Sequence, residues 1–148
     1  MAQQQIALGD KVLDGLSELA RLKHEQGDIP AAVELFERVR AGEVKMYGTG
    51  HPNTLNNLAL AKIAMGDPAS AVELYEEVRT GQAMAFGTSH PSYLNCLNNL
   101  AMAKYTLGDP ASAVELYEEV RTKQVKVFET SHPSYLNCLN NLAMAKKA

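Results

Sequence analysis

The sequence predicts an all-α protein, a solenoid of stacked antiparallel helix pairs. Residues 66–106 recur as residues 108–148, with 34 of 41 positions identical. A third, more diverged copy begins at Gly27, so the starts of successive copies lie 39 and 42 residues apart. Self-similarity at such a period indicates a repeat array in which each unit buries its apolar face against the next.

Each repeat opens on a first helix (helix A), which in all but the first repeat begins near a histidine–proline pair. In the best-defined repeat, Ser89 can cap the helix and Pro91 suits its first turn. Apolar residues then recur at helical spacing from Tyr93 to Ala103. Gly108 follows as a left-handed C-cap. We expect helices A at residues 10–26, 51–65, 90–107 and 132–146.

The second helix (helix B) begins directly after the glycine. Asp109 is a suitable N-cap and Pro110 a suitable first residue, and the same punctuation recurs at Asp28 and Asp67. Seven helices are therefore predicted, with helices B at residues 28–47, 67–86 and 109–128. The helix pairs are 10–47, 51–86 and 90–128, and the helix at 132–146 lacks a partner.

The whole chain, residues 1–148, is expected to form one array. Residues 1–8 align with the end of a helix B, because Gly9 stands where Gly48 stands in the next repeat. With an unpaired last helix as well, the pattern is typical of a slice of a longer array. One face of this last helix should be partly uncovered, and it carries Leu139, Leu142 and Ala143. An uncovered apolar face favours homo-oligomers that form through that helix.

These motifs resemble the tetratricopeptide repeat family, and the phrase GTSHPSYLNCLNNLA is similar to the 42-residue repeats of kinesin light chains. The resemblance implies a right-handed superhelical solenoid, TPR-like, whose helices A line a concave groove for a protein or peptide. The motif comprises two leucines, a small alanine, the turn glycine, a second alanine and an aromatic residue. Its three copies are Leu16, Leu19, Ala20, Gly27, Ala32 and Phe36; Leu55, Leu58, Ala59, Gly66, Ala71 and Tyr75; and Leu97, Leu100, Ala101, Gly108, Ala113 and Tyr117.

An asparagine ladder is predicted along the groove. Asparagine both donates and accepts hydrogen bonds, so a ladder of them can pair with a peptide backbone, and neighbouring Met and Tyr side chains can take apolar anchors. The alternative is that these amides are solvated or bond to neighbouring helices. Family members that capture a C-terminal carboxylate use Lys and Arg in such positions, so a different ligand is expected here. The predicted groove residues are Asn53, Asn56, Asn57, Leu60, Ile63, Asn95, Asn98, Asn99, Met102, Tyr105, Asn137, Asn140, Asn141 and Met144.

The first repeat predicts an acidic end of the groove. Asp14, Glu18 and Glu25 stand there, with Arg21 and His24 among them. A basic end of the ligand should therefore point toward the first repeat.

A lysine also stands four residues before each turn glycine. We expect its stem to pack and its ammonium group to reach solvent or a helix-B glutamate, the alternative being a row of ligand-facing cations. These lysines are Lys23, Lys62 and Lys104, with Lys146 by alignment.

Composition and spacing argue against several other functions. The net charge is −3 without a basic block, and no apolar run approaches the roughly 20 residues of a membrane span, so neither nucleic acid nor a membrane is expected. The histidines His51, His90 and His132 are too far apart in the sequence to match the close ligand spacing of a zinc site. We expect each of them to support the start of a helix. We predict that the protein is not an enzyme and that it binds no metal or cofactor. Cys96 and Cys138 are expected to be buried and reduced, as in a cytoplasmic protein. The alternative function is an architectural or self-assembling segment without a ligand of its own.

Overall fold

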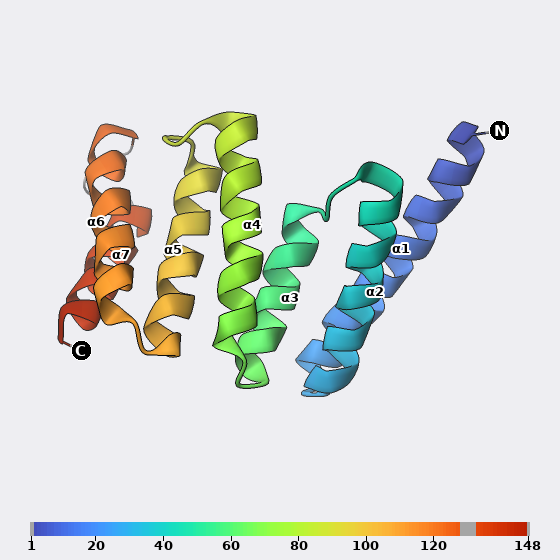
Figure 1. Cartoon of the computed structure of the whole chain (residues 1–148), viewed down its shortest axis with the longest axis horizontal. Coiled ribbons are helices and arrows are strands. Elements are labelled where there is room, and N and C mark those ends of the chain that lie inside the picture. Colours follow the sequence, from blue (N-terminus) through green and yellow to red (C-terminus); the bar gives the residue numbers. More distant parts are fainter. Residues whose placement is uncertain (1, 128–132, 148) are drawn as a thin grey trace. The chain divides into compact units, whose positions relative to one another are not determined.

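The computed structural model describes residues 2–127 and 133–147, and within them the side chains of residues 8–124 and 139–146. Seven α-helices and no strand occur in this part of the chain (Figure 1), which confirms the all-α prediction. The helices are α1 (Ala2–Glu25), α2 (Ile29–Tyr47), α3 (Pro52–Ala64), α4 (Pro68–Phe86), α5 (Pro91–Leu107), α6 (Pro110–Val127) and α7 (Pro133–Lys147). The predicted boundaries at residues 128 and 132 lie outside the described residues.

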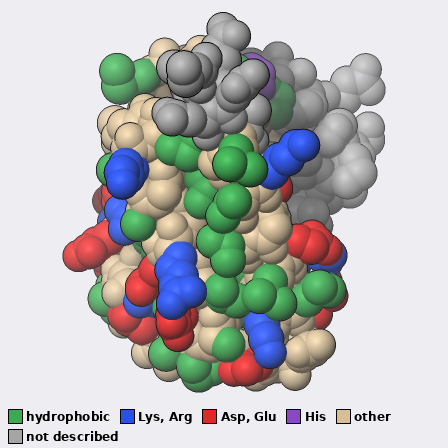
Figure 2. All heavy atoms as spheres, turned by 90° about the vertical axis from the view of Figure 1, so that its right-hand side faces the viewer, with side chains coloured by type: hydrophobic (Ala, Val, Ile, Leu, Met, Phe, Trp, Pro, Cys, Tyr) green, Lys and Arg blue, Asp and Glu red, His purple; other side chains and the backbone are tan. Residues whose placement is uncertain are grey.

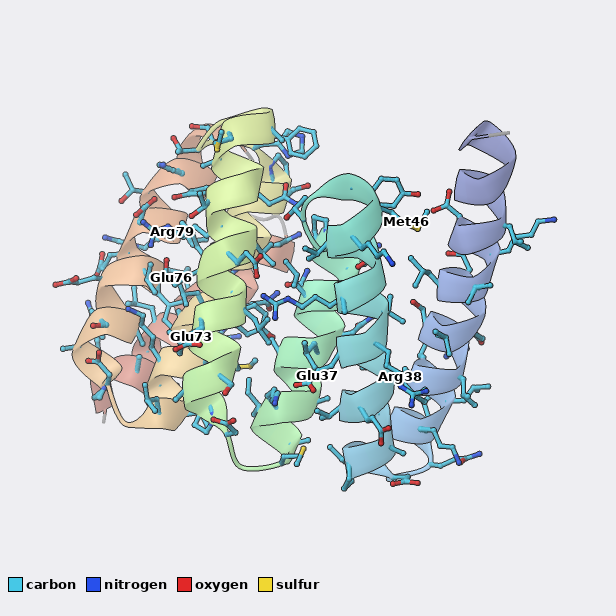
Figure 3. The ribbon with its side chains drawn as sticks, turned by 45° about the vertical axis from the view of Figure 1, so that its right-hand side comes forward. Glu37, Arg38, Met46, Glu73, Glu76 and Arg79 are labelled. Carbon is cyan, nitrogen blue, oxygen red and sulfur yellow. The ribbon has the colours of Figure 1, made fainter. Side chains whose placement is uncertain are left out.

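α1 differs most from its prediction. It begins at Ala2, not at residue 10, and continues without interruption through Gly9. A Cβ on Gly9 would stand 2.9 Å from the Cε atom of Met46, which lies between α2 and α1 (Figure 3). Gly9 therefore permits a close approach of two helices, whereas the aligned Gly48 ends α2 with a φ of 84°. Glycine serves both purposes, which is why the alignment placed a turn in the wrong position.

Histidines cap α3 and α5, and in α5 the cap is His90 in place of the predicted Ser89. The Nδ1 atoms of His51 and His90 each accept a hydrogen bond of 3.1 Å from the backbone N–H two residues later. The His90 ring also stacks on Phe86, with ring centroids 4.6 Å apart. Ser89 is thus not the cap, but the prediction that these histidines support the helix start is confirmed.

The predicted boundary between helix A and helix B is confirmed at two repeats. Asp28 and Asp109 accept hydrogen bonds of 3.4 and 3.2 Å from the backbone N–H three residues later. The hydrogen bonding of Ser112 to the Asp109 carboxyl lowers the pKa of that carboxyl. Gly108 ends α5 with a φ of 98°, a left-handed conformation that other residues rarely adopt.

The chain divides into two compact units, residues 1–67 and residues 68–148. In the first unit, α2 packs against both α1 and α3. In the second, α5 packs against α4 and α6, and α6 also packs against α7. A single superhelical array that includes both units stays a prediction. The alanines expected at close helix crossings are fully buried: Ala20, Ala32, Ala59, Ala71, Ala101 and Ala113.

The last helix is better covered than the sequence predicts. Leu142 is 6% exposed and packs in one core cluster with Ala101, Ala113 and Tyr117. Leu139 is half-buried, whereas Ala143 is exposed. The expectation that Leu142 lies uncovered is therefore wrong, because α5 and α6 together bury it without a following helix B.

Candidate functional site

α1, α3 and α5, three of the helices A, each present a largely exposed row of side chains, which we call the helix-A row. On α3 all four residues of the row are exposed, and their spacing of four, three and four residues places them on one helix face. On α5 the second residue is half-buried and the others are exposed. The rows are Asn53, Asn57, Leu60 and Ala64 on α3, and Asn95, Asn99, Met102 and Thr106 on α5.

Some predicted groove residues lie beside the row rather than on it. Asn56 and Asn98 are half-buried, and their Oδ1 atoms are enclosed and have no hydrogen-bond partner among the described residues. Ile63 is also half-buried, and Tyr105 packs against the core cluster of α5, α6 and α7. The exposed face therefore contains Asn57 and Asn99, each one residue beyond Asn56 and Asn98 of the predicted stripe. The sequence allowed both choices, because a helix with 3.6 residues per turn brings residues three and four positions apart onto one face.

α7 contributes a shorter set of described side chains. Asn140 and Met144 are exposed, and Asn141 is half-buried. Asn137 lies outside the described side chains, as does Cys138. The row position that Leu60 occupies on α3 is thus held by Met144 on α7, with 49% of its surface exposed.

The helix-A row of α1 is charged instead of amide-bearing. It consists of Asp14, Glu18, Arg21 and Glu25, all of them exposed, at positions 39 residues before the row of α3. The Arg21 guanidinium forms ion pairs with Glu18 and, at 2.5 Å, with Glu25. These contacts lower the pKa of Glu18 and raise that of Arg21. Three carboxylates and one guanidinium leave the row with two negative charges, so the predicted acidic end is partly neutralised.

The rows of α1 and α3 meet at a hollow of about 130 Å³ in the first unit. Its floor is apolar, since Phe36 of α2 is only 2% exposed and Leu60 lines one wall. Its rim is polar, with the Asn57 amide on one side and the charged side chains of α1 on the other. The lining residues are Arg21, His24, Glu25, Phe36, Asn57 and Leu60.

The hollow combines predicted and unpredicted residues. Asn57, Leu60 and Glu25 were expected at the groove, whereas Phe36 was expected only in the core. Arg21 could have been placed there from the sequence, because a shift of 39 residues relates it to Leu60. An apolar floor with a few polar groups at the rim suits an inserted apolar side chain whose backbone bonds to the rim.

Two of the repeated lysines pair with glutamates of a helix B, as expected. Lys62 Nζ lies 3.0 Å from a carboxylate oxygen of Glu37 on α2. Lys146 Nζ lies 3.0 Å from Glu118 on α6. Lys146, and to a lesser extent Arg121, lowers the pKa of the Glu118 carboxyl. These two lysines therefore bind glutamates of neighbouring helices, which is the arrangement expected of them.

Other kinds of site find little support in the residues described. Within them, no group of three or more His, Cys, Asp or Glu residues could hold a metal ion, and no helix has the length and apolar character to cross a membrane. Cys96 is buried and free, and its thiol donates a hydrogen bond of 3.4 Å to the Tyr75 carbonyl oxygen. Burial raises the pKa of the Cys96 thiol to about 12, so it is a poor nucleophile.

Comparison with known proteins identifies related chains. A family model of the tetratricopeptide repeat matches residues 11–81 and 50–124. A Podosopora anserina kinesin light chain protein with nearly identical TPR-like repeats has a similar crystal structure, with 38% identity and a TM-score of 0.79. That match covers 90% of this chain and 64% of the other. A search of curated proteins finds no match.

Two further solved structures share the fold at lower identity. BtubC (BKLC) from P. vanneervenii is 20% identical with a TM-score of 0.83, over 94% of this chain and 57% of that one. The first TPR of Spaghetti (RPAP3), bound to the HSP90 peptide SRMEEVD, is 18% identical with a TM-score of 0.64, over 92% of this chain and 94% of that one. The chain thus spans less than two thirds of the P. anserina and BtubC chains.

Proposed function

The chain belongs to the tetratricopeptide repeat family, and from that premise we propose that it is a protein-interaction scaffold whose helix-A rows bind an extended or helical segment of a partner. The observation that carries the proposal is the hollow between α1, α2 and α3. There the buried Phe36 ring forms a floor beside the exposed amide of Asn57. An apolar side chain of the partner enters the hollow, and Asn57 bonds to the partner's backbone.

The amide row extends this mode of binding to the second unit. Asn95 and Asn99 on α5 repeat the positions of Asn53 and Asn57, with Met102 in place of Leu60. A repeated amide followed by an apolar residue suits a ligand that presents backbone groups and apolar side chains in turn. The RPAP3 module shares the fold and is bound to a peptide, which supports peptide binding as the general mode.

The charge of α1 sets the orientation of the ligand. Asp14 has no charged partner on its own row, whereas Arg21 is shared by Glu18 and Glu25. The row keeps two negative charges, so we expect a lysine or arginine of the ligand to lie near α1. This preference is weaker than three free carboxylates would produce, because such exposed charges are screened by water and salt.

Selection from a phage library of random dodecamer peptides tests the proposal. The chain should enrich peptides with an apolar anchor and a basic residue at one end. Against a fluorescent synthetic copy of the best peptide, Asn57→Ala should weaken binding by about two- to tenfold, the usual effect of one lost hydrogen bond. Asn99→Ala combined with Asn141→Ala should also weaken it.

The matched control is Glu115→Ala, which changes an exposed residue of α6 outside the helix-A rows. It should bind the peptide as the parent chain does. Unchanged affinity of all the asparagine variants would remove the amides from the mechanism. Failure to enrich any peptide over an unrelated folded protein would contradict peptide binding itself.

The architectural alternative keeps one observation in its favour. α1 exposes large apolar side chains on a face apart from its charged row, including Leu8 at 65% and Val12 at 56% exposure. Such a face is more typical of a contact with another helix than of a solvent surface. Non-enzymatic function, a cytoplasmic location and an absence of nucleic-acid partners accord with the family and the composition, and they stay predictions.

A further inference from the structure

α1 carries a continuous exposed apolar line, which we call the outer stripe. It consists of Leu8, Val12, Leu19 and Leu22, which are 65%, 56%, 43% and 40% exposed. Their spacing places them along one side of the helix, with Gly15 in the gap between Val12 and Leu19. Figure 2 faces the side of the molecule on which α1 lies, and a column of hydrophobic side chains runs down it.

The second unit shows what covers the same face in another repeat. On α5 the residues equivalent to Val12, Gly15, Leu19 and Leu22 are buried, with at most 4% of their surface exposed. The covering helix is α4, which joins α5 through a short loop and runs in the opposite direction (Figure 1). The equivalent residues are Tyr93, Cys96, Leu100 and Ala103. The fold therefore matches this face to an antiparallel helix.

Gly15 is not explained by contacts within the chain. It lies in the middle of α1, where glycine destabilises a helix relative to alanine. A Cβ placed on it would meet nothing within 4 Å, in contrast to Gly9 and Gly42, where a Cβ would press on Met46 and Leu13. A missing side chain at the centre of an exposed apolar stripe lets the backbone of another helix approach closely.

Charges beside the stripe favour one orientation. Lys11 and Glu18 are both exposed and flank the stripe on either side of Gly15. Two copies of α1 packed in opposite directions about Gly15 bring Lys11 of each copy near Glu18 of the other. Packed in the same direction about a twofold axis, the copies would place these charges on opposite sides of the contact, where Lys11 and Glu18 of different copies do not pair.

We propose that the outer stripe is a self-recognition surface, on which α1 of a second copy of this chain packs antiparallel about a twofold axis near Gly15. Such a contact uses the same patch on both copies and closes as a dimer instead of extending into a filament. Of the helix-A row of α1 the contact engages only Glu18, at its edge, and it leaves Asp14, Arg21 and Glu25 open to a ligand. The self-association predicted for α7 is thereby assigned to the opposite end of the chain.

Sedimentation velocity over a hundredfold concentration range tests the dimer. The parent chain should pass from monomer to dimer, and Val12→Asp or Leu19→Asp should weaken association at least tenfold. The control is Met84→Asp, which changes an 85% exposed apolar residue of α4 and should associate as the parent does. A parent chain that stays monomeric throughout, or a dimer that both stripe variants keep intact, would overturn the proposal.

Gly15→Ala separates association from folding. Alanine improves the helix, so the monomer should unfold at a higher urea concentration than the parent. The added methyl group should nevertheless weaken the dimer severalfold, because it holds the two backbones apart. A variant that is more stable and dimerises as tightly as the parent would contradict the close approach at Gly15.

Cysteine cross-linking tests the orientation. Lys11→Cys and Glu18→Cys chains, mixed and mildly oxidised, should form a mixed disulfide more readily than either chain alone forms a disulfide with itself. Each variant chain carries only one of the two new cysteines, so a disulfide between them joins two chains. The parent chain, oxidised in parallel, controls for Cys96 and Cys138. Preferential self-linking of the single variants would overturn the antiparallel arrangement.

Discussion

α1 and α5 occupy the same position in their repeats, yet their surroundings differ. The outer face of α5 is buried under α4, whereas the equivalent face of α1 is exposed along the outer stripe. Leu100 is fully buried and its equivalent Leu19 is 43% exposed. The comparison teaches that a repeat motif specifies a helix and its inner face, while the neighbouring helices decide how much free energy each residue contributes.

The helix-A rows of the two helices differ in chemistry as well. α5 presents Asn95 and Asn99, which are uncharged and can bond to any peptide backbone. α1 presents Asp14 and Glu18 at the corresponding positions, with Arg21 bound to Glu18. One repeat framework therefore offers a general backbone-binding surface in one place and a charge-selective surface in another.

Truncation of the equivalent leucines is the strongest way to break this comparison. Leu100→Ala should destabilise the chain by about 2–5 kcal/mol, because it opens a cavity in a closed core. Leu19→Ala should cost about 1 kcal/mol or less at low protein concentration, since much of that side chain is already in water. Urea unfolding followed by circular dichroism measures both. Equal losses would show that the outer stripe is as well packed as α5.

Enlargement of a buried alanine tests the crossing of α5 and α6. Ala113 is fully buried beside Ala101 and Tyr117, so Ala113→Leu should destabilise by roughly 1–3 kcal/mol through overpacking. Ala111→Leu, an exposed change on the same helix, should alter stability by less than about 0.5 kcal/mol. A melting temperature of Ala113→Leu equal to the parent would place the close crossing elsewhere.

Removal of a histidine cap is expected to have a smaller effect. His90→Ala leaves the N–H of Ser92 without its acceptor and should cost about 1 kcal/mol, a usual value for a lost N-cap. His90→Asn restores an acceptor at the same position and should recover part of the loss. If alanine and asparagine destabilise equally in urea unfolding, then the stacking on Phe86, and not the cap, is the contribution of His90.

The charged row of α1 should give the smallest effect, visible as a dependence on pH. Arg21 lowers the pKa of Glu18 below its ordinary value of 4.5 in the folded state. The stabilisation is therefore present above that value and is lost as the pH falls through the lower, folded pKa. Glu18→Gln should flatten this part of the acid unfolding curve, while Glu115→Gln should leave it unchanged. An NMR titration of Glu18 with a midpoint at or above 4.5 would contradict the ion pair.

The order of the helices was predictable because its signals are local. Aspartate caps, prolines in first turns and left-handed glycines act within a few residues, and α2, α3, α4 and α5 begin and end close to their predicted bounds. α1 was the exception, since Gly9 looks like Gly48 in the sequence but meets Met46 in space. The ion pairs of the repeated lysines were also predictable, because the pair of Lys62 with Glu37 recurs two repeats later as the pair of Lys146 with Glu118.

The candidate site was only partly predictable. The asparagines and Leu60 follow from helical spacing, but the choice between Asn56 and Asn57 for the exposed row does not, as both spacings fit a helix. The contribution of Phe36 to the hollow depends on three helices meeting. Repeat alignment alone would relate Arg21 to Leu60, but not show that Arg21 bonds to Glu18 and Glu25.

The sequence by itself therefore determined the order of the helices, the aspartate caps and the family, because each depends on neighbours along the chain or on a motif repeated three times. Only the tertiary structure decided which faces are covered. It buried Leu142 beneath α5 and α6, left Leu19 in water, and showed that Gly9 meets a helix while Gly15 meets nothing. The physical reason is that burial depends on which helices pack against a face, and identical repeats have different neighbours at different places in the chain.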